Sequence, residues 1–190
     1  MKRKKYKALI IGASAGALEA LSVILPAFGR DFDMPIFVIV HVPPGKRSVL
    51  ADIFAAKCSL EAVEPEDKQP IKSGVIYLAP PNYHMLIEDK YSIALSSDDE
   101  VLFSRPSIDV SFESAAEVWG DELIGVILTG ANQDGARGLS AVAKAGGMTI
   151  VQDPNEAYAA AMPEAARKAC PDALILPLEQ IASHLLSITS

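Results

Sequence analysis

Short apolar runs alternate with amphipathic stretches along almost the whole chain. Runs of four to six apolar residues, rich in Val, Ile and Leu, are typical of strands that are buried on both faces. The sequence predicts strands at Ala8–Ile11, Pro35–Val40, Glu61–Glu64, Val75–Ala79, Ile124–Thr129, Met148–Val151 and Ala173–Leu176. Helical spacing of the apolar positions predicts helices at Leu18–Phe28, Val49–Cys58, Ile108–Trp119, Ala136–Ala145, Pro163–Cys170 and Leu178–Ile188.

This alternation indicates an α/β fold with a doubly wound, mainly parallel sheet and helices on both of its faces. Right-handed crossovers bring the carboxyl ends of parallel strands to one edge of such a sheet, where binding sites form. The segment His84–Leu95 departs from the pattern, since two short strands around Glu88–Lys90 predict an antiparallel hairpin near a sheet edge. No repeat or long linker divides the chain, so residues 1–190 are expected to form a single domain.

Composition narrows the class of protein. Half of the 190 residues are hydrophobic, which is enough for one sizeable core and argues against a disordered chain. The net charge of −7 argues against a broad nucleic-acid-binding face. The basic run Lys2–Lys7 is expected to be a solvated flank of the first strand.

Cysteine use and hydropathy give an expectation for the compartment. Cys58 and Cys170 lie in apolar surroundings and are expected to be buried thiols in a reducing environment. The sequence shows no secretory leader, and no apolar run approaches the roughly 20 residues that a membrane span needs. We therefore expect a cytoplasmic protein without membrane insertion.

The most informative local motif follows the first predicted strand. Gly12–Gly16 joins this strand to a helix and places Ser14 at the carboxyl end of the strand, beside the free N–H groups of the helix. Acyl-transfer enzymes present a nucleophilic serine in this way. The motif is short, and small residues are common in any tight turn. A dinucleotide fingerprint is disfavoured because Ser14 replaces its second glycine, and a P-loop is disfavoured because no lysine follows.

Two further residues that could act together with Ser14 follow predicted strands. His41 lies at the carboxyl end of the second predicted strand, and Asp134 lies in the glycine-rich turn after the strand Ile124–Thr129. At one sheet edge the three side chains would supply the nucleophile, base and orienting carboxylate of acyl transfer. The alternatives are a histidine satisfied by loop carbonyls and an aspartate that caps the helix beginning near Gly135. The order Ser, His, Asp differs from the Ser, Asp, His order of the α/β-hydrolases.

The other candidate residues carry weaker signals. His84 begins the predicted hairpin and is expected to have a structural or rim role, and His184 is expected at the surface of the last helix. The three histidines and two isolated cysteines show no metal-ligand spacing. A serine–histidine pair needs neither a metal nor an organic cofactor, so none is expected.

Together these motifs resemble the catalytic domain of the bacterial chemotaxis protein-glutamate methylesterases, the CheB family. The resemblance implies hydrolysis of glutamate methyl esters on the cytoplasmic helices of chemoreceptors, with release of methanol, and deamidation of glutamine in some relatives. It also implies that Ser14 is the nucleophile and that His41 and Asp134 are its catalytic partners. The matching segments occur in the family order over nearly the whole chain: Ile11–Gly16, His41–Gly45, Gly74–Pro80, His84–Met85, Arg105–Asp109, Gly125–Gly130, Asp134–Gly135 and Met162–Pro163.

The chain departs from the family pattern near the serine. The family usually has Ser-Thr-Gly-Gly where this chain has Ser14-Ala-Gly-Ala17, so one hydroxyl that can donate to an oxyanion is absent. The family's methionine after Thr-Gly is Ala131 here, although only its backbone N–H would be needed. These changes keep open a competing class, a non-catalytic interaction module that retains the fold.

Expectations about partners come from the same resemblance. The family typically carries an N-terminal phosphoacceptor receiver domain, and we expect none in this chain, so a separate receiver protein is one candidate source of control. Methylated chemoreceptor helices are the expected substrate. Arg105 is a candidate contact for acidic receptor side chains, with an ordinary loop arginine as the alternative.

Overall fold

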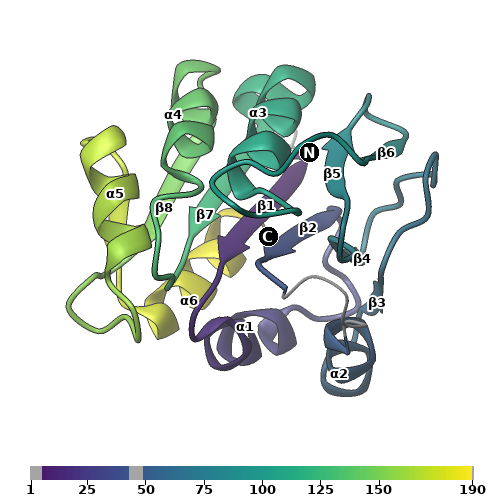
Figure 1. The fold of residues 1–190 in the computed structure, drawn as a ribbon. Helices are drawn as coiled ribbons and strands as arrows, with labels where there is room; N and C mark the ends of the chain where they lie inside the picture. Colours follow the sequence, from purple (N-terminus) through teal and green to yellow (C-terminus); the bar gives the residue numbers. More distant parts are fainter. Residues whose placement is uncertain (1–5, 43–48, 190) are drawn as a thin grey trace.

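The computed structural model describes residues 6–42 and 49–189 (Figure 1). Within them, seven strands form one sheet in the order β3-β4-β2-β1-β7-β8-β9, and every neighbouring pair is parallel. From β1 outwards, one half of the sheet contains β7, β8 and β9 in chain order, and the other half contains β2, β4 and β3, with β3 at the edge. The chain therefore extends the sheet on both sides of β1, which confirms the predicted doubly wound α/β fold. The strands are β1 (Ala8–Ala13), β2 (Ile36–Val40), β3 (Glu61–Val63), β4 (Val75–Leu78), β7 (Leu123–Ile127), β8 (Met148–Gln152) and β9 (Leu174–Leu176).

Helices cover both faces of this sheet, and each face has its own apolar core (Figure 1). One face carries α1 (Ala17–Ile24), the short 3-10 turn η1 (Leu25–Ala27), α2 (Leu50–Lys57) and α6 (Leu178–Thr189). The other carries α3 (Ile108–Trp119), α4 (Ala136–Lys144) and α5 (Ala161–Ala169). The 3-10 turn η2 (Gly120–Glu122) joins α3 to β7. Successive residues of β1 point to opposite cores, which explains why the strands are apolar throughout rather than alternating.

The predicted hairpin is confirmed as a separate two-stranded antiparallel sheet of β5 (His84–Ile87) and β6 (Ile93–Ser96). Its apolar side chains join the core beneath α3, and the N–H of Ile87 donates to Oγ of Ser114 on that helix at 3.0 Å. The hairpin therefore packs on α3 instead of extending the main sheet.

Helix α3 begins very close to β1 because position 12 has no side chain. A Cβ at Gly12 would lie 2.5 Å from Cγ2 of Ile108, the first residue of α3, and 3.1 Å from Cδ1 of Ile127. Such distances are shorter than van der Waals contact, so a larger residue would displace the start of the helix. Gly12 thus determines how closely the amino end of α3 approaches the carboxyl edge of the sheet.

The expectation of two buried thiols is confirmed only in part. Both cysteines are free, but only Cys170 is buried, whereas Cys58 is half-buried. The residues Lys2–Lys5 of the basic run lie outside the described part of the chain. Among the described residues, no helix combines the length and the apolarity required to cross a bilayer.

We expect Gly12→Ala to lower the free energy of unfolding by about 1–3 kcal/mol, because the added methyl overpacks the contact with Ile108. Urea unfolding measures this change. Gly29→Ala is the matched control, since its methyl would meet only the carboxylate of Asp31, at 2.6 Å, at the end of an exposed side chain. Equal stability of the two variants would contradict the tight contact at Gly12.

Candidate active site

Ser14 directly follows β1, in a turn that is hydrogen-bonded to Thr129, just beyond the end of the neighbouring strand β7. Its N–H donates to the carbonyl of Thr129 at 2.9 Å, and Oγ1 of Thr129 donates to the carbonyl of Ala15 at 2.8 Å. Gly16 then adopts φ 82°, a left-handed conformation that favours glycine, and α1 begins at the next residue. The turn leaves the Ser14 side chain half-buried at the carboxyl edge of the sheet.

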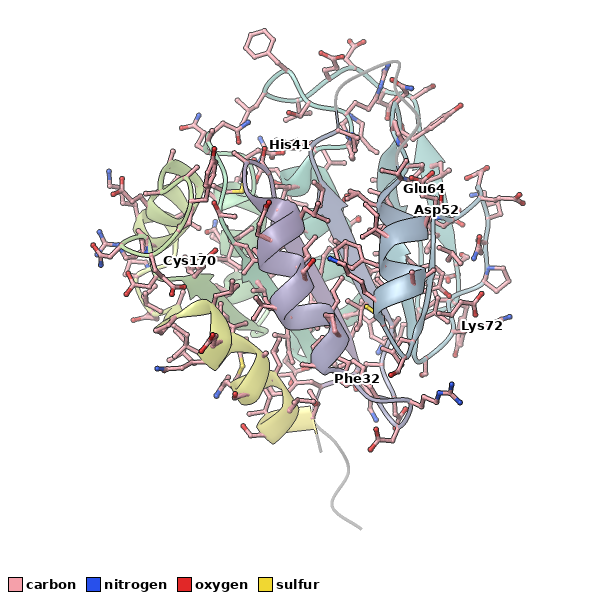
Figure 2. All side chains as sticks on the ribbon, turned by 90° about the horizontal axis from the view of Figure 1, so that it is seen from below. Phe32, His41, Asp52, Glu64, Lys72 and Cys170 are labelled. Carbon is pink, nitrogen blue, oxygen red and sulfur yellow. The ribbon has the colours of Figure 1, made fainter. Side chains whose placement is uncertain are left out.

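His41 lies beside Ser14 because β1 and β2 are adjacent and in register. Ala13 pairs with Val40, so the next residue of each strand emerges at the same level. Figure 2 shows His41 at one end of the sheet, with Phe32, which precedes β2, at the opposite end. The imidazole Nδ1 is 3.1 Å from Oγ of Ser14.

Asp134 completes the arrangement from the turn after β7. Its Oδ2 is 2.8 Å from Nε2 of His41, and its side chain is fully buried, while 13% of the His41 side chain is exposed. An ionised carboxylate only accepts hydrogen bonds, so Nε2 carries the proton and Nδ1 accepts from the Ser14 hydroxyl. The two ring nitrogens thus exchange the roles that they have in the serine-protease template.

The Asp134 carboxylate also caps the amino end of α3. Asp134 accepts from Oγ of Ser107 at 3.0 Å and from the backbone N–H groups of Ile108 and Asp109 at 2.7 and 2.9 Å. Burial alone would raise the pKa of Asp134. The hydrogen bond from His41 and those from the two N–H groups together outweigh burial and lower this pKa below its ordinary value. Asp134 is therefore ionised at neutral pH.

The alternative expectation is that Asp134 caps the helix that begins near Gly135. Asp134 does cap a helix, but a different one. Helix α4 has Gly135 itself at its N-cap with no side-chain hydrogen bond. Asp134 caps α3 instead, and it orients His41 as well. Capping and orienting are thus joint roles of one carboxylate rather than competing ones.

Asp109, on α3, caps α4 in return. Its Oδ1 accepts from the N–H groups of Gly135 and Gly138 at 2.9 and 2.7 Å. Burial raises the pKa of Asp109, and the nearby negative charge of Asp134 raises it further, against the opposing effect of these N–H groups and of Arg137. This exchange of caps could not be predicted from the sequence, because an aspartate in the first turn of a helix is ordinarily a partner of its own helix.

His84 supports the same region from the hairpin. It is 1% exposed, its Nδ1 accepts from the N–H of Ser107 at 3.1 Å, and its Nε2 donates to the carbonyl of Asp99 at 3.1 Å. These contacts agree with the expected structural role. His184, expected at the surface, is half-buried in α6.

Arg105 lines a pocket of about 250 Å³ together with His41. Its Nη1 donates to the carbonyls of Ser97 and Asp98 at 2.9 and 3.0 Å. The guanidinium therefore braces the loop between β6 and α3, which agrees with the loop-arginine alternative. Part of the predicted motif after His41, Pro43–Gly45, lies outside the described residues.

Two backbone N–H groups in the segments that follow β1 and β7, those of Ala15 and Ala131, make no hydrogen bond within the described residues. Ala15 follows Ser14, and Ala131 lies in the turn between β7 and Asp134. Both are main-chain donors and need no particular side chain, so the alanines that replace the family's threonine and methionine leave these donors in place. In the described ranges, no group of three or more His, Cys, Asp or Glu is placed to hold a metal ion.

A parallel sheet with serine, histidine and aspartate hydrogen-bonded in series at its carboxyl edge has the arrangement of acyl-transfer enzymes. The comparisons with known proteins identify the family more closely. Residues 9–185 match the family model described as CheB methylesterase. The chain therefore belongs to the CheB methylesterase family.

Individual relatives agree with this assignment. A Leptospira interrogans protein named "Putative protein-glutamate methylesterase/protein-glutamine glutaminase" is 46% identical over 96% of this chain and 95% of its own length. A Caulobacter vibrioides protein-glutamate methylesterase/protein-glutamine glutaminase is 37% identical over 95% of this chain and 53% of its own length. The crystal structure of the Thermotoga maritima CheB methylesterase catalytic domain has a TM-score of 0.91 at 30% identity, and the match covers 96% of this chain and 98% of that one.

The lowered pKa of Asp134 predicts how stability responds to acid. The ionised form is favoured in the folded state, so its contribution is complete above the ordinary aspartate pKa of about 3.9. It is lost as the pH falls through the lower folded-state pKa. In urea unfolding between about pH 6 and pH 3, we expect Asp134→Asn to lose less stability than the parent. If the free energy of unfolding fell equally with pH in the two proteins, the lowered pKa of Asp134 would be contradicted.

Proposed function

We propose that this chain hydrolyses glutamate methyl esters on the cytoplasmic helices of chemoreceptors and releases methanol, with Ser14, His41 and Asp134 as its catalytic residues. The observation that carries the proposal is the series of hydrogen bonds from Ser14 through His41 to Asp134 at the carboxyl edge of the sheet. The names of the relatives supply the substrate class. We further propose that the protein acts in the cytoplasm.

The reaction begins when Nδ1 of His41 takes the Ser14 hydroxyl proton as Oγ attacks the ester carbonyl. Asp134 stabilises the imidazolium that forms, and the N–H groups of Ala15 and Ala131 are the candidate donors to the oxyanion. Collapse of the tetrahedral intermediate breaks the bond to the methoxy group, which leaves as methanol with the proton from His41. Water, deprotonated by His41, then attacks the acyl-enzyme and releases the glutamate carboxylate and Ser14.

Deamidation of glutamine follows the same course with ammonia as the leaving group, and both relatives carry the glutaminase name. The acyl-enzyme is identical in the two reactions, because a glutamyl ester and a glutamine differ only in the group that leaves. We therefore propose deamidation as a second activity of the same residues.

Methanol release from a methylated receptor cytoplasmic fragment tests the proposal. We expect Ser14→Ala to abolish release without loss of stability, because alanine fits the turn between Gly12 and Gly16. Ser22→Ala is the matched control, in the helix α1 that follows the Ser14 turn, where the hydroxyl only accepts a hydrogen bond from Lys57 at 3.0 Å. Urea unfolding of each variant checks that the fold is intact.

Two results would overturn the proposal. Equal methanol release by Ser14→Ala and the parent would reject Ser14 as the nucleophile. A folded parent that binds the fragment and releases no methanol would favour the competing class, the non-catalytic interaction module.

A further inference from the structure

A tight turn at Val101–Ser104, beside the candidate active site, carries two large apolar side chains into solvent. Val101 and Ser104 exchange backbone hydrogen bonds at 3.1 and 3.0 Å and so close the turn. The two residues between them are Leu102, 40% exposed, and Phe103, 97% exposed. The turn lies in the segment between β6 and α3 (Figure 1).

The backbone of this turn is unfavourable for the residues that it holds. Leu102 and Phe103 have φ angles of 50° and 61°, the left-handed values of a type I′ turn, for which Asn and Gly are strongly preferred. Bulky residues rarely adopt such angles. Strain of this kind concentrates at ligand clamps and active sites, and here it holds two exposed apolar groups at one tip.

Phe103 links the His41 pocket to a larger groove. It lines the pocket of about 250 Å³ that contains His41, and it also lines a groove of about 1030 Å³ along α4 and α5. Small side chains line this groove on those two helices: Ala136, Ala161, Ala165 and Ala169. A groove with a small-residue wall admits the close approach of another backbone.

The borders of the groove carry both signs of charge. Arg137, Lys168 and Glu164 are exposed there, and Arg137 already pairs with Glu113 at 2.6 Å. A polypeptide with one apolar face and charged flanks of mixed sign fits these borders better than a wholly apolar or strongly single-signed ligand. An amphipathic helix is such a ligand.

We propose that the Leu102–Phe103 turn is a substrate-docking element, which packs on the apolar face of the helix that carries the glutamyl ester. With the ester in the His41 pocket, a residue three or four positions away on the same helix face meets Phe103. The helix then continues into the groove along α4 and α5. This inference rests on the proposed function, since it names the part of the protein that selects a helix-borne ester for that site.

Binding measured in the Ser14→Ala background separates docking from chemistry. The probe is the methylated receptor cytoplasmic fragment, and the readout is its dissociation constant. We expect Phe103→Ser to weaken binding about tenfold or more, since the contact buries much of an exposed phenyl ring. Tyr91→Ser is the matched control, because Tyr91 is 78% exposed on the β5–β6 turn and lines a different cavity, with Lys7 and Trp119.

A second variant removes the apolar groups while favouring the turn. Leu102→Asn with Phe103→Gly installs the sequence that a type I′ turn prefers, so we expect a higher melting temperature together with the same loss of binding. In the Ser14-containing protein, the double variant should raise KM for methanol release by about tenfold or more with a smaller change in kcat. A structural role alone would not make stability and affinity move in opposite directions.

The possible outcomes distinguish this inference from the proposed function. Unchanged affinity in both Phe103 variants overturns the docking role, even if Ser14→Ala abolishes turnover. Full turnover by Ser14→Ala rejects the proposed function, while the binding comparison still decides the role of the turn. A loss of affinity in Tyr158→Ser, with none in the Phe103 variants, would overturn the docking role and place the helix at Tyr158 instead, which packs against Gly16 and is 84% exposed.

Discussion

The buried carboxylate of Asp134 is the point on which the fold and the site both depend. It takes four hydrogen bonds, from His41, from the Ser107 hydroxyl and from two N–H groups at the start of α3. An unpaired charge at this depth would be very costly, and the four donors offset that cost. The hydrogen bonds that stabilise the buried charge also connect α3, which packs over β1, to His41, which follows β2.

Several segments that are distant in the sequence meet around the Asp134 carboxylate. Gly12 lets α3 approach the sheet, Asp109 on α3 caps α4, and α4 follows the turn that contains Asp134. His84 holds the Ser107 N–H from the hairpin. The side chains near Ser14 are therefore fixed by helix ends and buried carboxylates rather than by loop contacts alone, an arrangement that favours preorganisation for chemistry.

The sequence predicted the parts of this arrangement that depend on local pattern. Apolar runs gave the strands, and the residues that follow β1 and β2 could be placed at one edge because parallel strands share their direction. Helix ends were less accurate: α1 ends at Ile24 because Pro26 turns the chain into a 3-10 helix before the predicted end at Phe28. The exchange of caps between Asp109 and Asp134 depends on how α3 crosses the sheet, which no local signal contains.

The most direct test of the account is whether Asp134 acts on turnover through His41. Methanol release would be compared for His41→Ala, Asp134→Asn and the double variant, each at a pH where urea unfolding shows it to be folded. Residues that act as one unit have non-additive effects on rate. We expect Asp134→Asn to slow the parent by up to about 10⁴-fold and to leave the His41→Ala rate unchanged within a few-fold. If the two losses instead multiply in the double variant, Asp134 contributes independently of His41, and the proposed catalytic unit is wrong.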